Sequence, residues 1–265
     1  MRLGVRALAA TVATLALPAA AALGQGVEQC LPDFPAAQVV PACTAVIDSG
    51  QWTGAELVSA YGNRGNANLL LRRFDAALAD FEQVVALAPD IAAGYRGRGR
   101  AYHSLGRLDL ALSDYDRAIA LEPGVALAYD NRGQALRALG RHQEAIADFD
   151  RAIALEPDQA AAYVNRGNAW LDISQFERAI ADYDRGIALQ AGLALAFNNR
   201  AIARCKLGEP DAAMADLMQA LALAGSAEGW QRNLAELGYY DAAIDGDYGP
   251  ITEAALRQYM ADGCP

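Results

Sequence analysis

Arginine and aspartate recur through the middle of the sequence at a spacing that favours ion pairing. Each of five arginines is followed sixteen residues later by an aspartate, and successive arginines stand 34 residues apart. The pairs are Arg64/Asp80, Arg98/Asp114, Arg132/Asp148, Arg166/Asp182 and Arg200/Asp216. We expect each pair to bracket a turn between antiparallel helices and to meet between helices or between neighbouring repeats, where matched charges leave none unpaired at a partly buried seam. The pattern therefore predicts a structural ion-pair ladder, and the alternative is that an aspartate belongs to a binding site.

The residue types needed for catalysis do not form a motif. The two histidines, His103 and His142, lie in separate copies of the repeated unit, and no serine, cysteine or aspartate is tied to either by spacing. The sequence also has no phosphate-binding glycine loop, and its four scattered cysteines lack metal-ligand spacing. We therefore expect a protein that is not an enzyme and has no cofactor and no metal site.

The cysteines fall into two groups. Cys30 and Cys43 lie close together before the first full copy of the 34-residue unit. Cys205 lies in the last copy of that unit, and Cys264 lies near the C-terminus. Thiols in an oxidising compartment tend to pair. We predict a Cys30–Cys43 disulfide, and for Cys205 and Cys264 either a second disulfide that folds the C-terminal segment against the repeats or two free thiols.

These residues belong to a sequence that repeats every 34 positions. One aromatic residue marks each of five copies, and an alanine follows six residues after it: the aromatics are Tyr61, Tyr95, Tyr129, Tyr163 and Phe197. Small residues allow two helix backbones to approach closely, and the larger apolar residues fill the remaining volume. Pro89, Pro123 and Pro157 end the second helix of their copies because proline cannot continue the hydrogen-bond ladder. The pattern predicts a helical-hairpin solenoid.

Period and residue pattern together resemble the tetratricopeptide repeat family over residues 58–225. The five expected repeats are residues 58–91, 92–125, 126–159, 160–193 and 194–225. The resemblance implies an all-α, right-handed superhelix of helix pairs, with a concave groove that holds a peptide or a partner's helix. The last repeats depart from the pattern: Ala191 and Gly225 replace the proline, and Pro210 stands at the start of a second helix.

The same resemblance places the first helix of each repeat on the groove wall. It assigns to the wall a mixed polar strip with a basic beginning: Arg96, Arg100, His103, Asp130, Gln134, Arg137, Val164, Asn168, Asp172, Asn198 and Lys206. The strip lacks the Lys/Asn set that clamps a C-terminal carboxylate in some members of the family. We expect the arginines to receive an acidic peptide, and the alternative is a solvated helix face without a ligand.

After Ala227 the repeat pattern stops and a different motif begins. Two short helices are expected on either side of a glycine-rich loop, Asp245–Pro250. Residues Gln231, Leu234, Leu237-Gly238-Tyr239-Tyr240, Asp245-Gly246, Gly249, Thr252 and Ala255-Leu256 resemble the peptidoglycan-binding domain of bacterial envelope proteins. The resemblance implies a module over residues 227–262.

We expect the loop of this module to bind peptidoglycan through its backbone amides, the Asp245 carboxylate and the Tyr248 ring. The expected ligand-binding residues are Asp245, Gly246, Tyr248, Gly249 and Thr252. The alternative is that Asp245 and Gly246 only form a turn. A calcium loop starting at Asp241 is excluded, because Ala243 and Thr252 stand where oxygen-rich ligands are required.

The N-terminus has the features of a secretory signal peptide over residues 1–24. Arg2 and Arg6 precede an uncharged run, and small residues stand before the expected cleavage site at Gln25. The alternative, an uncleaved membrane anchor, is disfavoured because the run is short, rich in alanine and interrupted by Pro18. Residues 25–57 are expected to form a cap with an orphan helix stapled by the first disulfide, and Thr53 and Glu56 to form a capping box.

Composition limits the possible partners. The chain of 265 residues is 54% hydrophobic and 20% charged, with a formal net charge of −10. Such a surface repels phosphate backbones, so nucleic acid is not an expected partner. The sequence thus predicts an exported, periplasmic scaffold that binds a protein partner and peptidoglycan and has no membrane span after cleavage. The alternatives are an interaction scaffold whose C-terminal module is a degenerate cap, and an accessory subunit of a wall hydrolase or synthase.

Overall fold

The computed structural model describes residues 28–263, and within these residues it contains thirteen α-helices and no β-strand. The chain divides into two compact units between Pro89 and Asp90. The first unit contains α1 (Ala36–Asp48), α2 (Gly54–Leu70) and α3 (Phe74–Leu87). The second unit contains α4 (Ala92–Ser104), α5 (Leu108–Leu121), α6 (Ala126–Ala138), α7 (His142–Leu155), α8 (Ala160–Asp172), α9 (Phe176–Leu189), α10 (Ala194–Lys206), α11 (Pro210–Ala224), α12 (Glu228–Glu236) and α13 (Pro250–Ala261). The prediction of an all-helical fold is confirmed.

Small residues in the first helix of each hairpin face large residues in the second. A Cβ atom added to Gly133 would lie 2.7 Å from the ring of Phe149, and Gly99 and Gly167 stand equally close to tyrosine rings. The last hairpin differs, because Ala201 and Leu217 occupy these two positions. A larger residue at the glycine position is thus accompanied by a smaller side chain opposite it.

The ends of the helices follow the sequence signals. Helices α3, α5 and α7 each end two residues before the proline of their repeat. The turn inside three hairpins uses a glycine with positive φ, for example Gly106 (φ 72) and Gly140 (φ 74). In the other two hairpins Arg72 (φ 58) and Ser174 (φ 59) adopt this left-handed conformation without being glycine. The hairpin turn is therefore kept even where its sequence signal is missing.

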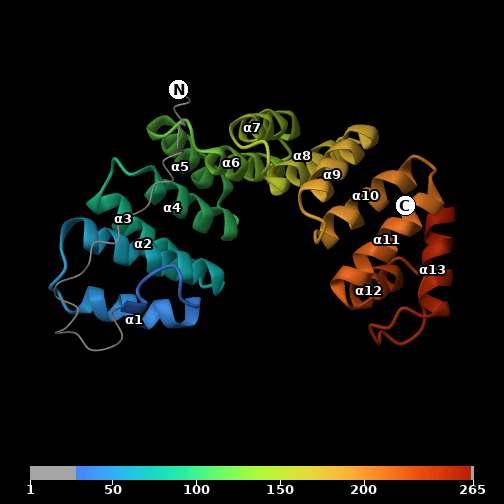
Figure 1. Ribbon diagram of the computed structural model, residues 1–265, viewed down its shortest axis with the longest axis horizontal. Coiled ribbons are helices and arrows are strands. Elements are labelled where there is room, and N and C mark those ends of the chain that lie inside the picture. Colours follow the sequence, from blue (N-terminus) through green and yellow to red (C-terminus); the bar gives the residue numbers. More distant parts are fainter. Residues whose placement is uncertain (1–27, 264–265) are drawn as a thin grey trace, which may run out of the picture. The chain divides into compact units, whose positions relative to one another are not determined.

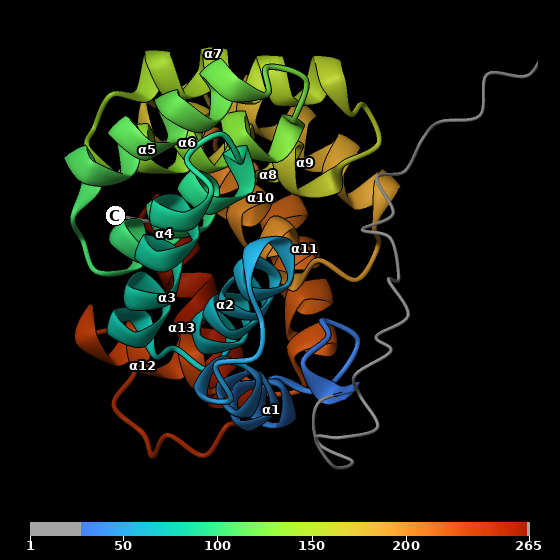
Figure 2. The same cartoon turned by 90° about the vertical axis from the view of Figure 1, so that its left-hand side faces the viewer.

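The first helices of the hairpins in the second unit form a continuous wall. Helix α4 contacts α6, α6 contacts α8, and α8 contacts α10. Figures 1 and 2 both show α6 and α8 on the same side of α7. Side chains at equivalent positions of these even-numbered helices are therefore neighbours.

The first unit is a helix, α1, packed against the α2–α3 hairpin. The predicted Cys30–Cys43 disulfide is present, and the Nδ2 atom of Asn63 donates a hydrogen bond to the carbonyl oxygen of Cys30 at 2.9 Å. Thr53 is the N-cap of α2, but its side chain makes no capping hydrogen bond, so the expected capping box is not formed. The predicted signal peptide, residues 1–24, lies outside the described residues.

Candidate functional site

The repeated Arg/Asp pairs all form ion pairs inside their hairpins, as predicted. The shortest N–O distances are 2.5–2.7 Å, and the carboxylates of all five aspartates are buried. In the third repeat, hydrogen bonds to Asp148 raise the pKa of the Arg132 guanidinium, and burial opposes this shift. Each buried carboxylate is thus paired with an arginine, which supports a structural role.

Three arginines also form a second ion pair that the sequence analysis missed. Arg132 Nη1 lies 2.7 Å from Asp116 Oδ1 of the preceding repeat, and Arg166 and Arg200 repeat this arrangement with Asp150 and Asp184. These outer aspartates are exposed. Their signal was in the sequence, because they too recur every 34 residues. The ladder therefore joins neighbouring repeats as well as the two helices of each hairpin.

The wall of even-numbered helices contains a polar cavity of about 320 Å³. Four predicted groove residues line it together: His103 of α4, Gln134 and Arg137 of α6, and Asp172 at the end of α8. Arg137 binds Asp172 through two hydrogen bonds of 2.5 and 3.1 Å, which link α6 to α8. Burial lowers the pKa of His103, which keeps its imidazole neutral at neutral pH. The cavity thus offers hydrogen-bonding groups, with its main charges paired.

A fifth predicted groove residue, Asp130, is buried at the side of this cavity. Its carboxylate accepts hydrogen bonds from Gln134 Nε2 at 2.7 Å and from Asn165 Nδ2 at 2.9 Å. Burial raises the pKa of Asp130, and these two hydrogen bonds oppose the shift. Asn165 also lines the cavity and was missed by sequence reasoning, although Asn131, Asn165 and Asn199 recur at 34-residue intervals.

The remaining predicted groove residues lie outside the cavity. Arg96 and Arg100 are half-buried on the face of α4 that carries His103, and burial lowers the pKa of Arg96. Asn168 is buried and accepts hydrogen bonds from the Tyr183 hydroxyl at 2.9 Å and from Asn199 Nδ2 at 2.7 Å. Asn198 donates to the side-chain oxygen of Asn199, and Lys206 is exposed at the end of α10. These residues belong to α4, α8 and α10, and none of them lines the cavity.

Val164 was expected on the groove wall, and that expectation is wrong. Its side chain is buried in the α8–α9 core, where a Cβ atom added to Gly186 would lie 2.9 Å from it. An apolar side chain at this position is more stable in the hairpin core than on a polar wall.

The C-terminal module is organised by one buried glutamine. The Nε2 atom of Gln231 lies within hydrogen-bonding distance of Asp245 Oδ1 (2.7 Å), the carbonyl oxygen of Asp247 (2.9 Å) and Thr252 Oγ1 (3.2 Å). Its Oε1 atom accepts a hydrogen bond from the Gly246 amide at 2.9 Å. Gln231 therefore ties the glycine-rich loop to the two helices that flank it.

This arrangement corrects the expected use of the loop amides. The Gly246 amide is engaged by Gln231, and the Asp247 amide donates to Asp245 Oδ1 at 2.9 Å. These two amides hold the loop in shape and are not available to a ligand. The hydrogen bonds from Gln231 and from the Asp247 amide also lower the pKa of Asp245, whose side chain is exposed.

The other predicted loop residues face the protein rather than solvent. Thr252 is 2% exposed and stabilises the loop through Gln231. Tyr248 packs against the apolar core of the last hairpin, its hydroxyl lies 3.9 Å from the Sδ atom of Met214, and burial raises its pKa. Gly249 is the N-cap of α13. The exposed polar side chains of the loop are therefore Asp245 and Asp247.

The module shares one apolar core with the last hairpin. Leu234, Leu256 and Tyr259 of the module belong to the same cluster of buried residues as Ala213 and Leu217 of α11. Figure 1 shows α12 and α13 beside α11, and α13 contacts α11. The module thus covers the final face of the repeat array.

Cys205 also faces this shared core. Its Sγ atom lies 3.8 Å from the carbonyl oxygen of Met260, four residues before Cys264 in the sequence. Cys264 lies outside the described residues, so the Cys205–Cys264 disulfide stays a prediction.

Comparison with protein families identifies both parts of the chain. Tetratricopeptide repeat models match residues 63–126 and 133–174, and a peptidoglycan binding domain model matches residues 230–259. The chain therefore contains tetratricopeptide repeats and ends in a segment that resembles the peptidoglycan-binding domain family. The matches agree with the resemblances found in the sequence.

Solved structures of tetratricopeptide repeat proteins have the same fold. MamA is 25% identical, with a TM-score of 0.54 over 61% of this chain and 94% of its own. YrrB, described as a TPR protein with an unusual peptide-binding site, is 19% identical, with a TM-score of 0.51 over 69% of this chain and 92% of its own. TTC0263 from Thermus thermophilus is 23% identical, with a TM-score of 0.52 over 59% of this chain and 84% of its own. These similarities support the solenoid fold.

In the part of the chain that the structure covers, no helix has the length and hydropathy to cross a membrane. Within the same residues, no three His, Cys, Asp or Glu side chains gather to hold a metal ion. A search of curated proteins finds no match to the chain.

Proposed function

We propose that the chain is an exported, non-enzymatic scaffold that binds a protein or peptide partner on the groove wall and peptidoglycan through its C-terminal module. The observation that carries this proposal is the presence, in one chain, of a polar wall of repeat helices and a segment matching the peptidoglycan binding domain model. The Cys30–Cys43 disulfide supports an oxidising, extracytoplasmic location. Together with the predicted signal peptide, it favours the periplasm.

On the groove wall, the proposed ligand is an acidic peptide. Arg96 and Arg100 provide positive charge at the α4 end, and His103 and Gln134 provide hydrogen-bonding groups in the cavity. Arg137 is already paired with Asp172, so a ligand carboxylate competes with that aspartate for the guanidinium. Binding should therefore weaken with salt and should be strengthened by Asp172→Asn, which leaves Arg137 more available. Fluorescence titration with a labelled acidic peptide measures both effects, and a neutral peptide of equal length is the control.

The wall-binding part of the proposal is tested by co-sedimentation of the purified chain with peptidoglycan sacculi. Asp245→Asn keeps the Oδ1 acceptor for Gln231 but removes the exposed charge. Asp247→Ala removes the second exposed charge and leaves the loop hydrogen bonds intact, because Asp247 makes them through its backbone. Losing a charge-assisted hydrogen bond costs about 1.5–3 kcal/mol, so the double variant should sediment at least about tenfold less. Asp241→Asn, an exposed acid before the loop, is the matched control. Wild-type protein that remains in the supernatant contradicts wall binding.

A second candidate function is favoured by the shared core of the module and α11. In this alternative the module is a cap for the repeats, and the chain acts through its groove alone. It predicts no sedimentation with sacculi but unchanged peptide binding. Recovery of a wall hydrolase or synthase from an envelope extract would instead support a role as an accessory subunit of that enzyme.

A further inference from the structure

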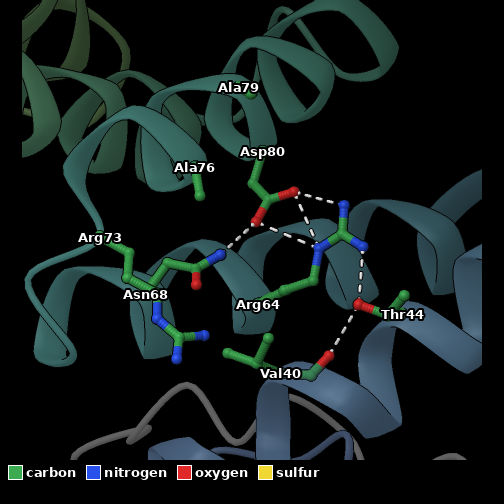
Figure 3. A pocket seen from close by; sticks show the side chains of 8 residues that line it. All are labelled: Val40, Thr44, Arg64, Asn68, Arg73, Ala76, Ala79 and Asp80. Atoms are coloured by element: carbon green, nitrogen blue, oxygen red, sulfur yellow. Dashed lines mark hydrogen bonds and ion pairs between the residues drawn. The ribbon is translucent and has the colours of Figure 1, made fainter.

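The first unit contains a cavity of about 330 Å³ that belongs neither to the groove wall nor to the C-terminal module. It lies between α1 and the α2–α3 hairpin, and Figure 3 shows Thr44, Asn68, Arg73 and Asp80 around it. We call it the seam pocket. Its lining combines aliphatic side chains with polar and charged ones: Val40, Ala76 and Ala79, and Thr44, Arg64, Asn68, Arg73 and Asp80.

The seam pocket exists because small residues replace large ones at repeating positions. Asn68 stands where later repeats have Tyr102, Leu136 and Trp170, and Thr44 stands where they have Leu112 and Ile146. In the second unit, Leu112, Ile146 and Trp170 pack around the core that contains Leu136. Asn68 is smaller than Tyr102 and Trp170, although it matches Leu136 in heavy atoms, and Thr44 is smaller than Leu112 and Ile146. The pocket is therefore the space of an apolar side chain that the first repeat lacks.

Asn68 makes a polar contact that only the last repeat also has at this position. Its Nδ2 atom donates to Asp80 Oδ2 at 3.0 Å, as Arg204 Nη1 of the last repeat donates to Asp216 Oδ2 at 2.8 Å. Arg204 extends further and reaches the carbonyl oxygen of Ala212 at 3.5 Å. The shape of the hairpin is thus preserved in the first repeat, and only the volume beyond the amide is left open.

The charge at the edge of the pocket lacks the ion-pair partner that its counterpart in the third repeat has. Arg141, the counterpart of Arg73 in the third repeat, forms an ion pair of 2.6 Å with Glu144. In the first repeat, Ala76 stands at the position of Glu144. Among residues 28–263, the Arg73 guanidinium has no ion-pair partner, whereas the other arginine of the pocket, Arg64, is neutralised by Asp80 at 2.7 Å. The pocket therefore lacks both an apolar group and an acid.

We propose that the seam pocket binds a ligand that supplies both missing groups: a large apolar or aromatic group with a carboxylate beside it. The apolar group occupies the volume beyond Asn68, and the carboxylate pairs with Arg73. This chemistry is shared by the C-terminal residue of a peptide and by a free aromatic amino acid. The site goes beyond the proposed function, because its residues lie in α1–α3.

An NMR titration of the full chain tests the ligand chemistry. The probes are N-acetylphenylalanine, its amide, and a hexapeptide ending in phenylalanine with either a free or an amidated C-terminus. The acids should cause saturable shifts of the Asn68 side-chain amide and the Ala76 methyl group, and the amides should bind about tenfold more weakly. If the hexapeptide with a free C-terminus binds more tightly than N-acetylphenylalanine, the ligand is a peptide. If the two bind with equal affinity, the ligand is a free amino acid. Equal binding of acids and amides, or no saturable shift, overturns the proposal.

Two variants restore the residues of later repeats and should close the pocket. Asn68→Trp fills the volume as Trp170 does, and Ala76→Glu pairs with Arg73 as Glu144 does with Arg141. Each should reduce binding by at least about tenfold. Asn68→Trp also removes the hydrogen bond to Asp80, so only Ala76→Glu is expected to leave thermal stability unchanged. Glu144→Ala is the matched control, because it frees Arg141 beside a filled core and should not alter binding. If Asn68→Trp misfolds, Ala76→Glu at an exposed position decides alone, and unchanged binding by folded Ala76→Glu refutes the proposal.

Discussion

Replacing Asp148 by alanine tests whether the ion-pair ladder stabilises the hairpins through burial. Asp148 holds Arg132 through two hydrogen bonds of 2.6 and 2.7 Å, and its side chain is 8% exposed. Arg132 has a second partner, Asp116, at the same distance of 2.7 Å, but that side chain is 62% exposed. The two aspartates bind the same arginine and differ in burial and in the number of hydrogen bonds, because Asp148 accepts two and Asp116 accepts one.

The structure sets different magnitudes for the two changes. Breaking a buried ion pair costs about 3–5 kcal/mol, because a charge is left without compensation. Arg132 is 25% exposed and keeps Asp116, so Asp148→Ala should cost less, about 2–3 kcal/mol. Removing the exposed partner by Asp116→Ala should cost less than about 1 kcal/mol.

Urea unfolding of both single variants and the double variant measures these costs. The double variant should lose more than the sum of the single changes, because Arg132 then has neither acid. Equal costs for Asp148→Ala and Asp116→Ala would refute the argument from burial. Partner binding should persist in folded Asp148→Ala protein, and its loss from a fully stable variant would place Asp148 in a binding site.

Three further predictions concern packing, protonation and oxidation. Gly133→Ala should cost about 1–3 kcal/mol through overpacking, and Phe149→Leu should offset part of that cost in the double variant, so additive losses in thermal unfolding contradict the compensation. Burial lowers the folded-state pKa of His103 below its ordinary value of about 6.5, so the unfolded chain binds the proton more readily. The free energy of unfolding should therefore fall as pH drops from about 6.5 through the lowered pKa, and His103→Gln should flatten this dependence between about pH 7 and pH 5. Peptide mapping without reductant should recover Cys30 linked to Cys43, and reduction should cost roughly 3 kcal/mol; free thiols after periplasmic expression would exclude the stapled cap.

The fold was predictable because its signals are local and repeated. Alanine, glycine and proline recur with the period of one hairpin, so the register of five repeats, and with it the partner of Arg132, follow from counting along the sequence. The direction in which a side chain points was less predictable. Tyr248 lies in a loop that has the composition of an exposed site, but its ring packs against the core shared with α11 and is partly buried. That contact joins segments with no shared sequence pattern.

The candidate groove shows the same distinction. The family resemblance gave the helices of the wall, and His103, Gln134, Arg137 and Asp172 meet in one cavity. It did not show that Arg137 would be paired with Asp172, because that contact depends on how α6 and α8 stack. The seam pocket escaped sequence reasoning for a different reason: it is defined by the absence of large residues, which becomes visible only when the repeats are compared position by position.

The shared core of the module and the last hairpin determines how wall binding can be tested. Leu234 and Leu256 are fully buried in the cluster that contains Leu217 of α11. Deleting the module would expose that apolar face and destabilise α11, because buried apolar surface would return to water. A truncated chain could therefore lose partner binding because its repeats are less stable, which would say nothing about wall binding. Substitutions at Asp245 and Asp247 leave the shared core intact, so they separate recognition by the loop from the stability of the repeats.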